Sequence, residues 1–92
     1  MYYCKPALRV NCPFYVASIS EAAFARIKAN RGWAPTWVVS DGLNGAKEWR
    51  FKDAAGRLYN VYTRDGRPRV SGYEDTSPAD VARFEAWILK NS

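Results

Sequence analysis

Two turn sequences between residues 47 and 70 fix how this chain can pair with itself. The first runs from Asp53 to Arg57 and has Gly56 where a three-residue hairpin loop needs a positive φ angle. The second, Asp65-Gly66, is a dipeptide favoured in two-residue type I′ turns, because both of its residues have positive φ. Together they predict a three-stranded antiparallel meander with a defined register.

This register sends apolar and basic side chains to opposite faces of the meander. A four-residue first loop would instead mix the two sets, and a slip of one residue would expose the aromatic rings and bury the guanidinium groups. The predicted inner face carries Trp49, Phe51, Tyr59, Val61 and Val70. The predicted outer face carries Arg50, Lys52, Arg64, Arg67 and Arg69 around Tyr62, with Glu48 as its only acid.

A helix is predicted before the meander. Ser18 and Glu21 have the spacing of a capping box ahead of residues 22–29, and Gly32 is expected to end the helix as its C′ residue. Its apolar side chains recur at helical spacing, which predicts a buried stripe. The stripe consists of Ile19, Ala23, Phe24 and Ile27.

A second helix is predicted after the meander. Ser77 and Pro78 suit its N-cap and its first helical position, and the pattern continues to about Lys90. The buried stripe expected to lie against the inner sheet face consists of Val81, Phe84, Trp87 and Ile88.

The remaining segments complete the fold prediction. Residues 1–17 suggest one or two short strands, residues 36–40 another, and residues 41–45 a loop. The resulting order predicts an α+β fold, with a mostly antiparallel sheet of four or so strands and two helices packed on one face. A chain of 92 residues is long enough for one domain, residues 1–92.

The distribution of charge points to a polyanionic partner. The formal net charge is +5, and residues 47–69 alone hold seven bases against three acids. Such asymmetry favours contact with nucleic acid or with an acidic protein surface. The candidate partner-binding residues are the outer-face set, Arg50, Lys52, Tyr62, Arg64, Arg67 and Arg69, and a second group, Lys28 and Arg31 beside Trp33.

Residues that usually carry catalysis or bind metals are sparse. There is no histidine, and Cys4 and Cys12 have a spacing that matches no metal-ligand pattern, although whether they form a disulfide stays open. The acids fall mostly in turns, and the glycines form no phosphate-binding loop. We therefore expect no enzyme, metal, cofactor or small-molecule substrate. The absence of a long apolar run and of a signal-peptide pattern predicts a cytoplasmic protein that does not enter a membrane.

The stretch at residues 64–69, Arg-Asp-Gly-Arg-Pro-Arg, puts several arginines on a small sheet-and-helix domain without catalytic groups. In this overall character the chain resembles phage-encoded anti-CRISPR proteins that inhibit type I surveillance complexes. The resemblance implies a monomeric, non-enzymatic inhibitor in the host cytoplasm. It would dock on Cas subunits, with or without contact to the guide RNA, and sterically block binding of target DNA.

A second resemblance leaves an alternative open. The stretch from Trp49-Arg50-Phe51 to Val70, followed by a helix, resembles the three-stranded DNA-reading sheets of integrase amino-terminal domains. It implies a small sheet-type module that binds DNA or RNA directly. Binding to naked nucleic acid with an affinity that rises as the salt concentration falls would favour this alternative over the inhibitor.

Overall fold

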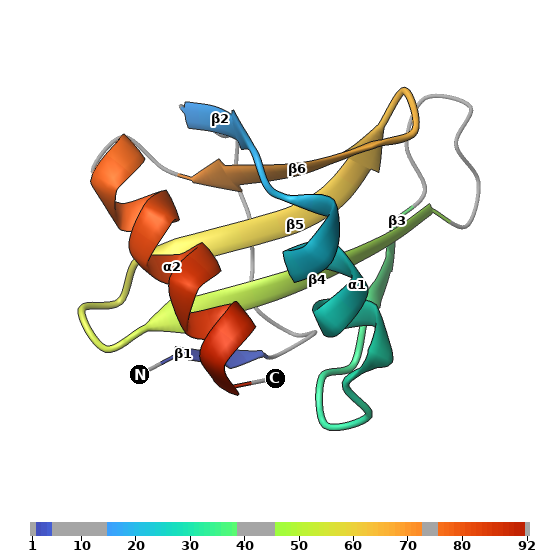
Figure 1. Ribbon diagram of the computed structural model, residues 1–92, viewed down its shortest axis with the longest axis horizontal. Helices are drawn as coiled ribbons and strands as arrows, with labels where there is room; N and C mark the ends of the chain where they lie inside the picture. The colour runs from blue at the N-terminus through green and yellow to red at the C-terminus, as the bar shows by residue number, and fades with distance from the viewer. Residues whose placement is uncertain (1, 5–14, 39–45, 73–75, 92) are drawn as a thin grey trace.

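The computed structural model of the chain describes residues 2–4, 15–38, 46–72 and 76–91. The elements in chain order are β1 (Tyr2–Cys4), β2 (Tyr15–Ser18), α1 (Glu21–Ala29), β3 (Thr36–Val38), β4 (Ala46–Asp53), β5 (Leu58–Arg64), β6 (Arg67–Gly72) and α2 (Pro78–Asn91). Five strands follow one antiparallel path, β1-β4-β5-β6-β2, and β3 pairs with the start of β4. Both helices lie on the same face of the sheet (Figure 1).

The predicted α+β fold is confirmed, with more strands than the four or so expected. The additional strands are short and lie at the sides of the meander: β1 pairs with β4, and β2 pairs with β6. Strand β3 is described from Thr36 to Val38. The predicted loop at 41–45 and Cys12 lie outside the described residues, and Cys4 is a free thiol in the structure. Neither described helix is long and apolar enough to cross a membrane.

Both hairpin turns have the backbone that the sequence predicts. Gly56 has φ 88°, the Asp53 N–H donates to the Arg57 carbonyl at 3.0 Å, and the Gly56 N–H donates to the Asp53 carbonyl at 3.0 Å. Asp65 and Gly66 have φ 54° and 75°, as a type I′ turn requires. The predicted loop lengths are therefore confirmed.

The pairing register of the meander is also confirmed. Strand β4 meets β5 with Trp49 opposite Val61 and Phe51 opposite Tyr59, and β5 meets β6 with Val61 opposite Val70. All five of these side chains are at most 5% exposed. Because side chains alternate along a strand, their burial leaves the basic positions between them on the other face.

The core lies between this inner face and the two helices. Phe84 of α2 is fully buried, with its ring stacked on Tyr59 at 4.9 Å and meeting Phe51 edge-on at 5.1 Å. Ala23 and Ile27 of α1 are also fully buried in the same cluster. Burial of each large apolar side chain contributes roughly 1.5 to 3 kcal/mol, so this contact between layers dominates stability.

The capping of α1 differs from the prediction at both ends. Ser20, not Ser18, is the N-cap, and its hydroxyl accepts from the Ala23 N–H at 3.2 Å. Ser18 instead ends β2. The Ser20 N–H donates to the Glu85 carboxylate of α2 at 2.7 Å, so a glutamate from the other helix fills the place of Glu21 in the predicted capping box.

The helix ends earlier than the glycine suggested. Asn30 is the C-cap, its N–H donates to the carbonyls of Arg26 and Ile27, and its side-chain oxygen accepts from the Gly32 N–H at 2.8 Å. Gly32 does not have a positive φ, so the prediction that it acts as a left-handed C′ residue is wrong. The asparagine side chain supplies the turn that the glycine was expected to supply.

Candidate binding surface

The outer face of the meander is the surface on which the sequence placed most of its candidate binding residues. Arg50 lies opposite Asn60, Tyr62 opposite Arg69 and Arg64 opposite Arg67, so the meander brings these positions to one face. Lys52 lies on the same face, opposite Leu58. The structure therefore groups all six predicted outer-face residues, and both described helices lie on the other side of the sheet.

On the β4 side of this face, the positive charge is neutralised by an acid of the same strand. Glu48 is 8% exposed, and its carboxylate accepts from the Arg50 guanidinium at 2.6 and 2.7 Å. The same carboxylate accepts from the Asn60 side-chain amide at 2.9 Å. Because one buried acid is matched to Arg50, this arginine adds little net charge to the surface.

The other end of the face is different in charge and exposure. We name Arg64, Arg67 and Arg69, around the β5–β6 turn, the hairpin-end cluster. Arg64 and Arg67 are exposed and lie directly opposite each other, whereas Arg69 is half-buried and donates to the Ser18 hydroxyl at 2.6 Å. Within the described part of the chain, the side chains of Arg64 and Arg67 make no ion pair or hydrogen bond. Positive charge is therefore concentrated at this end.

Tyr62 lies beside the hairpin-end cluster. It is opposite Arg69 and two residues from Arg64 on the same strand, and the residue is half-buried. An aromatic side chain among guanidinium groups combines an apolar platform with positive charge, which suits a ligand that has a planar ring beside an anionic group.

The second predicted group lies elsewhere. Lys28 belongs to α1 and has its ammonium 4.7 Å from the centre of the Phe24 ring. Trp33 meets Phe51 edge-on at 5.2 Å and stacks on Trp87 at 5.7 Å, so it closes the edge of the core. Arg31 is exposed in the turn after α1. The structure does not bring this group together with the outer sheet face.

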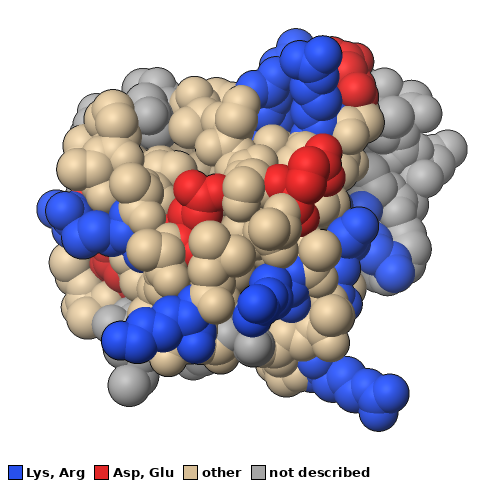
Figure 2. Space-filling view, in the orientation of Figure 1, with Lys and Arg blue, Asp and Glu red and all other residues tan. Residues whose placement is uncertain are grey.

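The helical side of the molecule carries charge of both signs. Figure 2 views the molecule from this side and shows acidic side chains in the middle and at the upper edge, interspersed with lysine and arginine. This mixture does not form a basic patch of one sign, in contrast to the hairpin-end cluster. A polyanion would find less favourable potential here.

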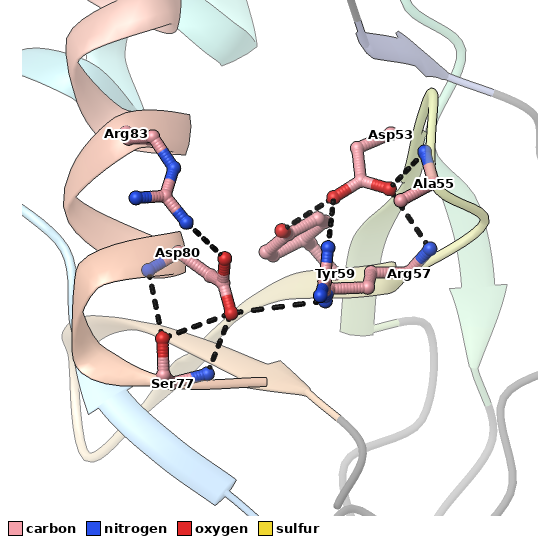
Figure 3. A network of polar contacts seen from close by, with 7 residues as sticks. All are labelled: Asp53, Ala55, Arg57, Tyr59, Ser77, Asp80 and Arg83. Carbon is pink, nitrogen blue, oxygen red and sulfur yellow. Dashed lines mark hydrogen bonds and ion pairs between the residues drawn. The ribbon is translucent and has the colours of Figure 1, made fainter. Parts of the chain in front are cut away.

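A polar network that the sequence did not reveal as a unit joins the β4–β5 turn to the start of α2 (Figure 3). Asp53 accepts from the N–H groups of Ala55 and Arg57 at 2.9 Å each and from the Tyr59 hydroxyl at 2.8 Å. The Arg57 guanidinium lies 3.9 Å from Asp53 and 3.8 Å from Asp80, and so links the two carboxylates. We name these residues, with Ser77 and Arg83, the acid–arginine network.

Asp80 is the buried centre of this network. It accepts from the Ser77 N–H and hydroxyl at 2.9 Å each, donates its own N–H to the Ser77 hydroxyl at 3.2 Å, and pairs with Arg83. The hydrogen bonds from Ser77, together with the Arg83 and Arg57 guanidinium groups, hold the pKa of the Asp80 carboxyl below its usual range. The spacing of Ser77 and Asp80 was a visible signal, but the two arginines that reach Asp80 were not.

The network has acids matched to its bases and is built for stability. Burial and the hydrogen bond to Asp53 raise the pKa of Tyr59, so its hydroxyl stays protonated and acts as a donor. Each described carboxylate here has its oxygens occupied by donors from the chain itself. Such groups have little capacity left to bind a substrate.

The chemistry of Cys4 and of the acids gives no further site in the described residues. Burial raises the pKa of the Cys4 thiol to about 11, and its thiol donates to the Ala34 carbonyl at 3.6 Å, so it is a poor nucleophile. Among residues 2–4, 15–38, 46–72 and 76–91, no three His, Cys, Asp or Glu side chains lie close enough to hold a metal ion.

Comparison with known proteins adds no assignment. No family model, no curated protein and no solved structure matches this chain. A functional argument therefore rests on the chemistry of its own surface.

Proposed function

We propose that this chain is a non-enzymatic binding protein that docks on a polyanionic host assembly through the outer face of β4, β5 and β6. The observation that carries the proposal is the hairpin-end cluster, where Arg64 and Arg67 are exposed without an ionic partner in the described chain. Guanidinium groups bind phosphates and carboxylates through paired hydrogen bonds, so this surface suits an acidic partner.

The partner that fits the proposal best is a ribonucleoprotein, which offers phosphates and protein surface side by side. By its overall character the chain is proposed to be a phage inhibitor of a type I CRISPR complex, acting as a monomer in the host cytoplasm. Its basic outer face would bind acidic groups on Cas subunits or guide RNA and sterically block the binding of target DNA. Its own positive charge argues against mimicry of DNA, since a mimic would carry negative charge.

The experiment is capture of the assembly from cells that contain it, with the tagged full chain as bait. Reversal of Arg64, Arg67 and Arg69 together to Glu should reduce capture at least about 100-fold, because interfacial charge contacts of this kind carry several kcal/mol in total. The melting temperature should change by only a few degrees, because Arg64 and Arg67 are exposed and the half-buried Arg69 loses one hydrogen bond, to the hydroxyl of Ser18.

A matched control makes the same change in net charge on the helical side. Reversal of Lys28, Arg31 and Lys90 to Glu should leave capture within about twofold. Lys28 and Lys90 belong to the helices on the opposite face of the sheet, and Arg31 follows α1, so the docking proposal does not include the two of them that the sequence listed as candidates, Lys28 and Arg31 (Figure 1). Intact capture by the outer-face variant, or equal loss in both variants, would show that the outer face is not the docking surface.

Direct binding to nucleic acid is the second candidate function, and the position of Tyr62 among arginines favours it. The two functions differ in relative affinity. If a free strand or duplex binds as tightly as the assembly, the chain is a nucleic-acid-binding module. If the assembly binds far more tightly than any free nucleic acid, docking on the assembly is the function.

A further inference from the structure

We infer that the hairpin-end cluster takes a single strand of nucleic acid, with Tyr62 as the platform on which one base stacks. This inference rests on the proposed function and names the component of the ribonucleoprotein that the outer face contacts. A free strand is only one component of the assembly, so it should bind more weakly than the whole assembly but at the same residues.

The pairing of β5 with β6 places the aromatic ring and the positive charges at the spacing that a single strand of nucleic acid requires. Residues directly opposite each other on antiparallel strands have side chains about 5 Å apart, which applies to Tyr62 and Arg69. Arg67 lies two residues from Arg69 on β6, and two residues of strand span roughly 7 Å. A base on the ring would therefore have its neighbouring phosphates within reach of two or three guanidinium groups.

The arrangement is unfavourable for the isolated chain, which is why it indicates a ligand. Arg64 and Arg67 are directly opposite each other, and like charges in that position destabilise a sheet. The acid nearest in sequence, Asp65, makes no ion pair with either of them in the described structure. A local arrangement that opposes folding without an internal compensation is typical of a functional surface.

The same residues favour a single strand over other polyanions. Bases expose their flat faces only when they are unstacked, and a ring lying on a sheet offers a surface for them. A duplex keeps its bases stacked on one another, so it has no free base face to place on the ring of Tyr62. An acidic protein could pair with the arginines, but its carboxylates have no aromatic face to stack on the ring of Tyr62.

The test measures binding of a fluorescein-labelled 12-mer of oligouridine to the full chain by anisotropy over a range of salt concentrations. Tyr62→Ala should weaken binding roughly tenfold or more, and Tyr62→Phe should stay within about twofold, because stacking uses the ring and not the hydroxyl. Replacing Arg64 and Arg67 by Gln should reduce the salt slope by about 1.4, the value for two phosphate contacts on a single strand.

Two further probes and one further variant keep the result decisive. A 12-base-pair duplex and polyglutamate should bind more weakly than oligouridine, and Tyr62→Ala should not affect their binding. Tyr62→Leu fills the same place on the sheet without an aromatic face, so it should lose strand binding as Tyr62→Ala does, even if the alanine variant is unstable.

The outcomes separate this inference from the proposed function. Equal binding of polyglutamate and oligouridine, with no effect of Tyr62 variants, would overturn the single-strand inference while docking through the arginines survives. No detectable strand binding at low salt, or preference for the duplex, would overturn it as well. The docking proposal itself would be overturned only by undiminished capture of the assembly by the outer-face reversal, or by equal loss of capture in that variant and its control.

Discussion

Strand β5 has arginines near both of its ends, and the two groups are organised in opposite ways. At the β4–β5 turn, Arg57 lies between Asp53 and Asp80, within 4 Å of each carboxylate. At the β5–β6 turn, Arg64 and Arg67 face each other without an ionic partner in the described chain. The same residue type serves structure where acids match it and is available to a partner where they do not.

The difference follows from what surrounds each end. The acid–arginine network is covered by the start of α2, and a buried charge requires a partner because its desolvation is costly (Figure 3). In the hairpin-end cluster, Arg64 and Arg67 are exposed to solvent, where a guanidinium without an ionic partner costs little. Mutations at the first end should therefore change the free energy of unfolding, and mutations at the second should change binding.

The largest expected effect comes from the ring that supports the network end. Phe84→Ala should lower the free energy of unfolding by about 3 to 5 kcal/mol, because it leaves a cavity beside Tyr59 and Phe51. Urea unfolding followed by tryptophan fluorescence measures the loss. Phe84→Leu, which keeps most of the volume, should lose less. A loss below about 1 kcal/mol in the alanine variant would contradict the packing of α2 on the inner face.

A smaller effect is expected from removing one acid at each end. Asp80→Asn should lower the free energy of unfolding by about 1 to 3 kcal/mol, because it removes a charged acceptor from Arg57 and Arg83. Asp65→Asn is the matched control at the hairpin tip. It should change the free energy of unfolding by less than about 0.5 kcal/mol, since asparagine tolerates the positive φ there. Equal losses in the two variants would remove the distinction between the two ends.

Acid titration sharpens the same contrast. The folded protein holds the pKa of Asp80 below its ordinary value of 3.8, so the stability that this carboxylate contributes is present above pH 4 and is lost as pH falls below it. The difference in unfolding free energy between the wild type and Asp80→Asn should therefore be full at pH 7 and should shrink below about pH 4. A difference that stays constant from pH 7 to pH 3 would show that the Asp80 charge is not what stabilises α2.

The meander could be predicted from the sequence because its turns and its pattern agree. The glycine in the first loop, the Asp65-Gly66 dipeptide and the alternation of apolar and basic residues all require one register, which the structure has. Local signals were sufficient there because each strand pairs with its neighbour in sequence. The six candidate residues of the outer face were grouped for the same reason.

What the sequence did not reveal depends on contacts between distant segments. Ser20 is capped by Glu85, which is 65 residues away, and this partner cannot be read from local spacing. Glu48 was predicted as the single acid of the outer face, but its burial and its bonds to Arg50 and Asn60 require the paired strands. Trp33 was listed as a candidate binding residue, and its packing at the edge of the core could not be predicted because its contacts, Phe51 and Trp87, come from two other elements.

The smallest expected effect tests the hairpin-end cluster directly, because stability and binding should change in opposite directions. Arg67→Glu replaces a repulsion with an attraction opposite Arg64, and opposite charges at this position contribute roughly 0.2 to 1 kcal/mol. The variant should therefore unfold at slightly higher urea concentration than the wild type while capturing less of the partner.

Arg67→Gln removes the repulsion alone and should give a smaller gain in stability with an intermediate loss of binding. A variant that is more stable but binds the partner less tightly shows that the wild-type residue serves binding and not the fold. A fall in stability for Arg67→Glu would mean that the two arginines do not repel each other in the folded chain, and the main physical reason for assigning a ligand to this end of the sheet would be lost.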